Sequence, residues 1–144
     1  MSTEKGCRDL MRHFLVPIAN KDDAHKTAQA LHQYSPGQVT VLYVVEKGGG
    51  VPDKTPVEQS EQIAADSFAV FHTFFPEADE HITYGRDVVE AIFAVADEIG
   101  ASAIVYRSRG GNRIMHFLSG DLSLKLITQS DRPVIALPRV DSTE

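Results

Sequence analysis

The segment AIVYRSRGGNRIMHFLSGDLSLKLITQSDRPVIALP (residues 103–138) decides the fold of this chain. It opens with a strand-like run at residues 103–106 and continues through a glycine-bearing loop at residues 107–112. A helical segment at residues 122–130 and an apolar strand at residues 133–137 follow. A strand, a glycine loop and a helix start in this order favour an anion site, because glycine lets the backbone approach a ligand and the helix N-terminus offers free N–H groups.

The remainder of the chain alternates between strand and helix patterns. Residues 14–19 and 39–45 are apolar runs typical of buried parallel strands, and residues 81–84 indicate a short strand. Asn20, with Asp23 three residues later, predicts a helix start, and Asp87 with Glu90 repeats this capping pattern. Gly100 is placed to end the helix that Asp87 begins. The alternation predicts an open parallel sheet with helices on both faces.

The apolar spacing within the helices predicts which side of each one is buried. In the first helix the buried residues are expected to be Ala24, Ala28 and Leu31. In a helix that runs to about residue 75, the buried side is expected to hold Ile63, Val70 and Phe74 (or Phe71). In the third helix the expected set is Val88, Ile92, Val95, Ala96 and Ile99.

The bulk properties fit one globular domain. The 144 residues are 42% apolar and 24% charged, with a polar lead-in at residues 1–11 and a single expected domain at residues 12–140. The net charge of −6 argues against a nucleic-acid surface over the whole domain. No apolar run is long enough for membrane insertion, and residues 8–12 interrupt any signal-peptide core, so a cytoplasmic location is expected.

The C-terminal half resembles the universal stress protein family. The family pattern is glycine, two residues, glycine, nine residues, glycine, and then serine or threonine; the four positions here hold Arg107, Gly110, Gly120 and Asp121. Similar matches are the run FLVPI at residues 14–18, Gly85 before a helix, and the run PVI at residues 133–135. The resemblance implies a Rossmann-like fold, similar to that of adenine nucleotide alpha hydrolases, with a five-stranded sheet in the order 3-2-1-4-5.

The resemblance also implies an ATP site, and this chain departs from it at three positions. It would place a ligand beside Pro17, Ala19, Val44, Arg107, Arg109, Gly110, Gly120 and Asp121. Ala19 stands where the family has an acidic residue that helps to hold adenosine, and Arg107 stands where the family has glycine. Asp121 replaces a hydroxyl that touches phosphate; a carboxylate about 4 Å from a phosphate charge costs about 4 kcal/mol at an effective dielectric near 20. A second interpretation makes Asp121 simply the N-cap of the last helix.

Three arginines in this region leave two interpretations open. Arg107, Arg109 and Arg113 surround the glycine loop, and guanidinium groups can hold an anion bidentately. Alternatively they form a solvated basic surface or pair internally with Asp121. No catalytic residue and no metal site are expected, because the chain lacks a nucleophile elbow and its six histidines are dispersed, which favours surface positions.

Two functions follow from the resemblance. The first is a non-enzymatic stress-response or regulatory protein that acts as a homodimer, binds an unidentified protein partner, and has a degraded or repurposed nucleotide site. The alternative is a functional ATP or AMP binder, with or without slow hydrolysis, in which Arg107 replaces the lost contacts. The family commonly dimerises through the last strand, here the apolar residues 133–137, which would otherwise leave an open sheet edge.

Overall fold

A computed structural model describes residues 9–46, 57–107 and 120–138, and within these ranges five strands form one sheet. The strands are β1 (His13–Ile18), β2 (Gln38–Glu46), β3 (Asp79–Gly85), β4 (Ala103–Arg107) and β5 (Val134–Leu137). Every adjacent pair is parallel, and the order is β3-β2-β1-β4-β5. The predicted parallel sheet and its strand order are therefore confirmed.

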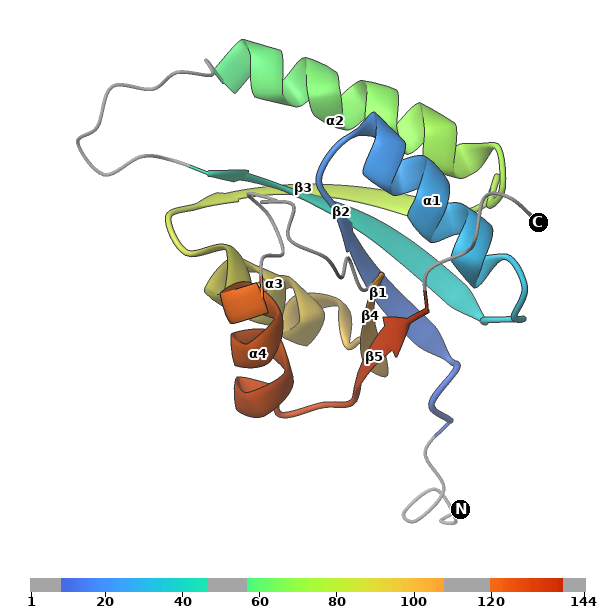
Figure 1. The fold of residues 1–144 in the computed structure, drawn as a ribbon, viewed down its shortest axis with the longest axis vertical. Helices are drawn as coiled ribbons and strands as arrows, with labels where there is room; N and C mark the ends of the chain where they lie inside the picture. Colours follow the sequence, from blue (N-terminus) through green and yellow to red (C-terminus); the bar gives the residue numbers. More distant parts are fainter. Residues whose placement is uncertain (1–8, 47–56, 108–119, 139–144) are drawn as a thin grey trace.

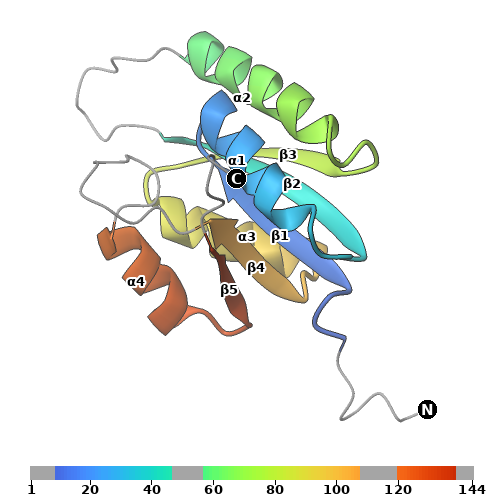
Figure 2. The ribbon, with the colours of Figure 1, turned by 45° about the vertical axis from the view of Figure 1, so that its right-hand side comes forward.

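Helices cover both faces of this sheet. The helices α1 (Lys21–Leu31) and α2 (Val57–His72) lie on one face, and α3 (Val88–Ile99) and α4 (Gly120–Gln129) lie on the other (Figure 1). The turned view in Figure 2 shows the same two layers of helix with the sheet between them. This arrangement explains why β1 is buried along its whole length and reads as a continuous apolar run.

Alternate strand residues feed two separate cores. Phe14 and Val16 of β1 pack with residues of α1 and α2, such as Leu31 and Phe71, in the first core. Leu15, between them in sequence, packs on the opposite face in the second core, which also holds buried residues of α3 and α4. Side chains that are consecutive in a strand point to opposite faces, so one apolar strand serves both layers.

Local signals in the sequence set the helix ends as predicted. The Asn20 side chain accepts a hydrogen bond from the backbone N–H of Asp23, and the Asp87 side chain accepts one from that of Glu90. The pKa of Asp87 is lowered, first by the hydrogen bond from the Glu90 backbone N–H and then by the Lys125 ammonium, which lies 3.0 Å from Asp87 Oδ2. Gly100 ends α3 with φ of 66° and ψ of 42°, a left-handed conformation that costs glycine little.

The buried side of α2 differs from the prediction. Ala64, Ser67, Phe68 and Phe71 are buried, whereas Ile63, Val70 and Phe74 are only partly buried. Phe71, the alternative to Phe74, is therefore the correct anchor. A serine can lie on the buried side because the Ser67 hydroxyl donates a 2.7 Å hydrogen bond to the Ile63 carbonyl oxygen, which leaves no unmet polar group.

The sequence suggested surface positions for the histidines, but one of them, His13, is buried. His13 begins β1 and is 6% exposed, and its Nε2 lies 2.8 Å from the Thr40 hydroxyl of β2. Burial, and next the nearby Arg12 charge, lower the pKa of His13, which favours the neutral ring. The surface expectation failed because the strand begins one residue earlier than the apolar pattern indicates, and the neighbouring strand supplies a polar partner.

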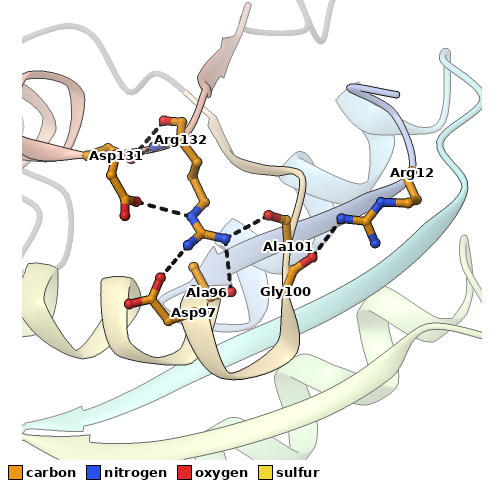
Figure 3. Close-up of polar contacts among 8 residues, drawn as sticks. Arg12, Ala96, Asp97, Gly100, Ala101, Asp131 and Arg132 are labelled. Carbon is orange, nitrogen blue, oxygen red and sulfur yellow. Dashed lines mark hydrogen bonds and ion pairs between the residues drawn. The ribbon is translucent and has the colours of Figure 1, made fainter. Parts of the chain in front are cut away.

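Two arginines, Arg12 and Arg132, bind the backbone where α3 ends, near the amino-terminal end of β4 (Figure 3). The Arg132 Nη1 donates to the carbonyl oxygens of Ala96 (3.1 Å) and Ala101 (2.7 Å), and its Nη2 pairs with Asp97. Arg12 donates to the Gly100 carbonyl oxygen at 2.8 Å. Both cations therefore satisfy carbonyl groups where α3 ends and the chain enters β4, the helix end that favours positive charge.

We expect Arg132→Met to lower the free energy of unfolding by about 2–3 kcal/mol, because charge-assisted hydrogen bonds to two carbonyls and a carboxylate are lost together. Arg12→Met, which removes one bond from an exposed side chain, should cost less than about 1 kcal/mol. Urea unfolding of both variants measures the difference. Equal effects of the two substitutions would contradict this account of the α3 terminus.

Candidate functional site

The carboxyl ends of β1 and β4 meet at the point where the strand order reverses. Within the sheet, β2 and β3 lie on one side of β1. The chain then returns, and β4 and β5 lie on the other side of β1. The strands β1 and β4 pair directly, with Phe14 opposite Ala103 and Leu15 opposite Ile104. In open α/β sheets this edge is where ligands bind, because the loops that leave the two strands diverge there.

The turn from β1 into α1 is organised by Asp23. Its Oδ2 accepts a 2.8 Å hydrogen bond from the backbone N–H of Ala19, and its own N–H donates to the Asn20 side chain at 2.8 Å. The Thr27 hydroxyl, one helical turn on, donates to Asp23 Oδ1 at 3.3 Å. The Asp23 side chain is 2% exposed, so a carboxylate is buried at the candidate ligand edge.

Arg107, the last residue of β4, meets this carboxylate. Its Nη2 lies 3.4 Å from Asp23 Oδ1, and its side chain is 10% exposed. Arg107 therefore does not belong to a solvated surface, which was one of the alternatives, and it pairs with Asp23. The reason is topological, because parallel pairing of β1 with β4 brings the start of α1 to the end of β4. The pair spans 84 residues of sequence. The other alternative, pairing with Asp121, involves a side chain outside the described part of the chain.

The guanidinium of Arg107 is incompletely satisfied. Among the described residues, no hydrogen-bond acceptor lies within reach of its buried Nε–H. The contact to Asp23 is also long for a charge-assisted bond, which usually measures about 2.7–2.9 Å. More than nine in ten buried polar groups in proteins have a partner, so a buried arginine donor without one is unusual.

The other predicted site residues fall into three groups. Pro17 and Val44 are buried in β1 and β2, and Ala19, at the end of β1, is partly buried against the second core. Gly120 begins α4 and Asp121 follows it, and the side chain of Asp121 lies outside the described part of the chain. Arg109, Gly110 and Arg113 lie outside the described residues. The structure thus brings together Ala19 and Arg107, and adds Asp23, which sequence reasoning treated only as a helix-start residue.

No group of three or more histidine, cysteine, aspartate or glutamate side chains in residues 9–46, 57–107 and 120–138 is arranged to hold a metal ion. No helix in these ranges combines the length and the apolar character that crossing a membrane requires.

Comparison with known proteins identifies one family. The model of the universal stress protein family matches residues 11–138 of this chain. No curated protein sequence matches significantly.

Solved structures share the fold at low sequence identity. A universal stress protein from Archaeoglobus fulgidus is 20% identical with a TM-score of 0.68, covering 88% of this chain and 98% of that one. The universal stress protein from Archaeoglobus fulgidus in complex with dAMP is 20% identical with a TM-score of 0.65, covering 88% and 97%. A universal stress protein in complex with cAMP is 14% identical with a TM-score of 0.62, covering 90% and 98%.

Proposed function

The chain belongs to the universal stress protein family, and from that premise we propose that it is a non-enzymatic regulatory protein of the stress response whose nucleotide site is degraded or repurposed. The single observation that carries this proposal is the ion pair between Arg107 and Asp23. It lies at the carboxyl ends of the two central strands, where the fold places ligands. An arginine side chain and a buried carboxylate occupy the edge at which a nucleotide would need bare backbone and hydrogen-bond donors.

Three features of this edge oppose ATP. Ala19 offers a methyl group in place of the acidic side chain that holds adenosine in the resembled family. The backbone N–H of Ala19 is already bound to Asp23, so it is not available to a ligand. The Asp23 carboxylate would also lie near the phosphates, and like charges in a buried site repel strongly. Together these features support weak ATP binding or none.

A nucleotide-binding function is the second candidate, and one observation favours it. The buried Nε–H of Arg107 has no acceptor among the described residues, and a phosphate oxygen is a suitable one. The structures with dAMP and cAMP concern related proteins, and each of these two ligands carries a single phosphate group. Isothermal titration of the purified chain with ATP separates the two candidates. Our proposal expects no measurable binding at micromolar ATP, and the second candidate expects saturation there.

We also propose that the protein acts as a homodimer through β5, the last strand in the order of the sheet. Within the described part of the chain this strand pairs only with β4, and its exposed residue Ala136 lies between Ile135 and Leu137. A short apolar edge strand that a second copy pairs is protected from uncontrolled aggregation. The contact would be isologous, with the same residues contributed by both copies.

Light scattering is therefore expected to give twice the chain mass at micromolar concentration. Ala136→Lys should shift the mass to that of a monomer without unfolding the chain, because Ala136 is exposed and each copy would bring a charged lysine to the apolar contact. Glu98→Lys, a charge change at an exposed position of α3, is the matched control and should remain dimeric. A monomer mass for the unaltered chain would contradict this proposal.

A further inference from the structure

The Nε–H of Arg107 is a buried hydrogen-bond donor. Within the described residues it has no acceptor, and the Arg107 side chain is only 10% exposed. A guanidinium carries five N–H donors in a planar fork and accepts nothing, so each of these donors needs an acceptor atom from another group. The Asp23 carboxylate approaches Nη2 of this fork, not Nε.

Asp23 does not supply this acceptor in the structure, because its oxygens face other donors. Its Oδ2 accepts the Ala19 N–H at 2.8 Å, and its Oδ1 accepts the Thr27 hydroxyl at 3.3 Å. These bonds fix the carboxylate to the start of α1, and they leave the contact with Arg107 long at 3.4 Å. Asp23 therefore serves as a counter-charge that holds the guanidinium in place, while the Nε–H of Arg107 has no acceptor among the described residues.

We propose that Arg107 is the receptor for a compact oxyanion, a phosphate group, at the carboxyl ends of β1 and β4. A phosphate oxygen accepts from Nε–H, and the low dielectric of a buried site strengthens the contact. Asp23 limits the negative charge of the ligands that the site can bind, because its carboxylate already neutralises the positive charge of the Arg107 guanidinium. A single phosphate is therefore favoured over a triphosphate. The inference rests on the proposed function, since it names what a repurposed site would take.

Phosphate can come from free inorganic phosphate or from a nucleoside monophosphate, and calorimetry with inorganic phosphate, AMP and adenosine distinguishes the sources. We expect inorganic phosphate to bind with an affinity of about 1 mM or tighter. Equal affinity for AMP assigns the site to free phosphate. Affinity for AMP at least about tenfold higher, with no binding of adenosine, assigns it to a nucleotide phosphate. Absence of phosphate and AMP binding up to about ten times that concentration would overturn the inference.

Three variants show whether Arg107 holds the anion. Arg107→Lys keeps a cation facing Asp23 but has no Nε–H at this position, so phosphate affinity should fall about tenfold or more while the fold is retained. Asp23→Asn keeps an oxygen acceptor for the Ala19 N–H and removes the opposing charge, so affinity should rise about tenfold. Arg86→Lys, at an exposed arginine, is the matched control and should bind as the unaltered chain does.

The outcomes separate this inference from the proposed function. Phosphate binding that is unchanged in Arg107→Lys would place the anion elsewhere and overturn the inference alone. Tight ATP binding by the unaltered chain would overturn the proposed function, whatever phosphate does. If the chain binds neither ATP nor phosphate, the result supports a degraded nucleotide site and overturns the inference that Arg107 binds phosphate.

Discussion

Arg107→Met is expected to lower the free energy of unfolding by about 2–4 kcal/mol, near the cost of breaking a buried ion pair. Methionine fills similar apolar space, but it removes the guanidinium that faces the Asp23 carboxylate in a region where both side chains are almost inaccessible. The 3.4 Å separation puts the expected loss at or below the usual range. Urea or thermal unfolding, followed by circular dichroism, measures it.

A double variant tests whether the carboxylate causes this loss. In Asp23→Asn/Arg107→Met, the amide that replaces the carboxylate keeps an acceptor oxygen for the Ala19 N–H but carries no charge, so most of the stability should return. Arg86→Met, at an exposed arginine, should change stability by no more than about 0.5 kcal/mol. A loss below that value in Arg107→Met, or no recovery in the double variant, would contradict the assigned role of the pair.

The second large effect is a gain of ATP binding. The resemblance suggests Ala19→Asp, Arg107→Gly and Asp121→Ser, and the structure adds Asp23→Asn, because Arg107→Gly alone would leave a buried carboxylate without the cation that faces it. The fourfold variant restores an acceptor for adenosine and removes two negative charges near the phosphates. We expect its affinity for ATP to reach about 10 μM, at least about 100-fold tighter than that of the unaltered chain.

The same variant without Ala19→Asp is the matched control for this gain. It has the same phosphate region but lacks the acceptor for adenosine, so its affinity should be about tenfold weaker than that of the fourfold variant. Both proteins are titrated calorimetrically after circular dichroism has shown that they fold. A folded fourfold variant that binds no ATP would mean that the named residues do not control the site.

Local signals in the sequence were sufficient to predict the alternation of strands and helices. Asn20 and Asp87 begin helices, and Gly100 ends one, because these side chains or conformations satisfy groups within a few residues. The apolar runs of β1 and β2 predicted strands covered on both faces, and the structure places a core on each side of them. The strand order came from the family resemblance, since alternation alone does not fix it.

The candidate site could be predicted only in part, because its contacts join distant segments. Ala19 and Arg107 were recognised as departures from a family pattern, but the partner of Arg107 lies 84 residues earlier. A capping pattern explains Asp23 as a helix-start residue and gives no sign that its carboxylate also meets β4. The spacing of Ala19 and Asp23, four residues apart at a strand end, was the one available signal. The buried side of α2 was misjudged for a related reason, since periodicity ranks large apolar residues above the small Ala64 and Ser67.

We propose that the ion pair of Arg107 and Asp23 occupies the edge at which the fold would otherwise bind a nucleotide. Isothermal titration of the unaltered, purified chain with ATP, with and without magnesium, tests it most directly. We predict no saturable heat at micromolar ATP and no nucleotide released when the purified protein is denatured. Low-micromolar binding, or ATP carried through purification, would contradict this proposal.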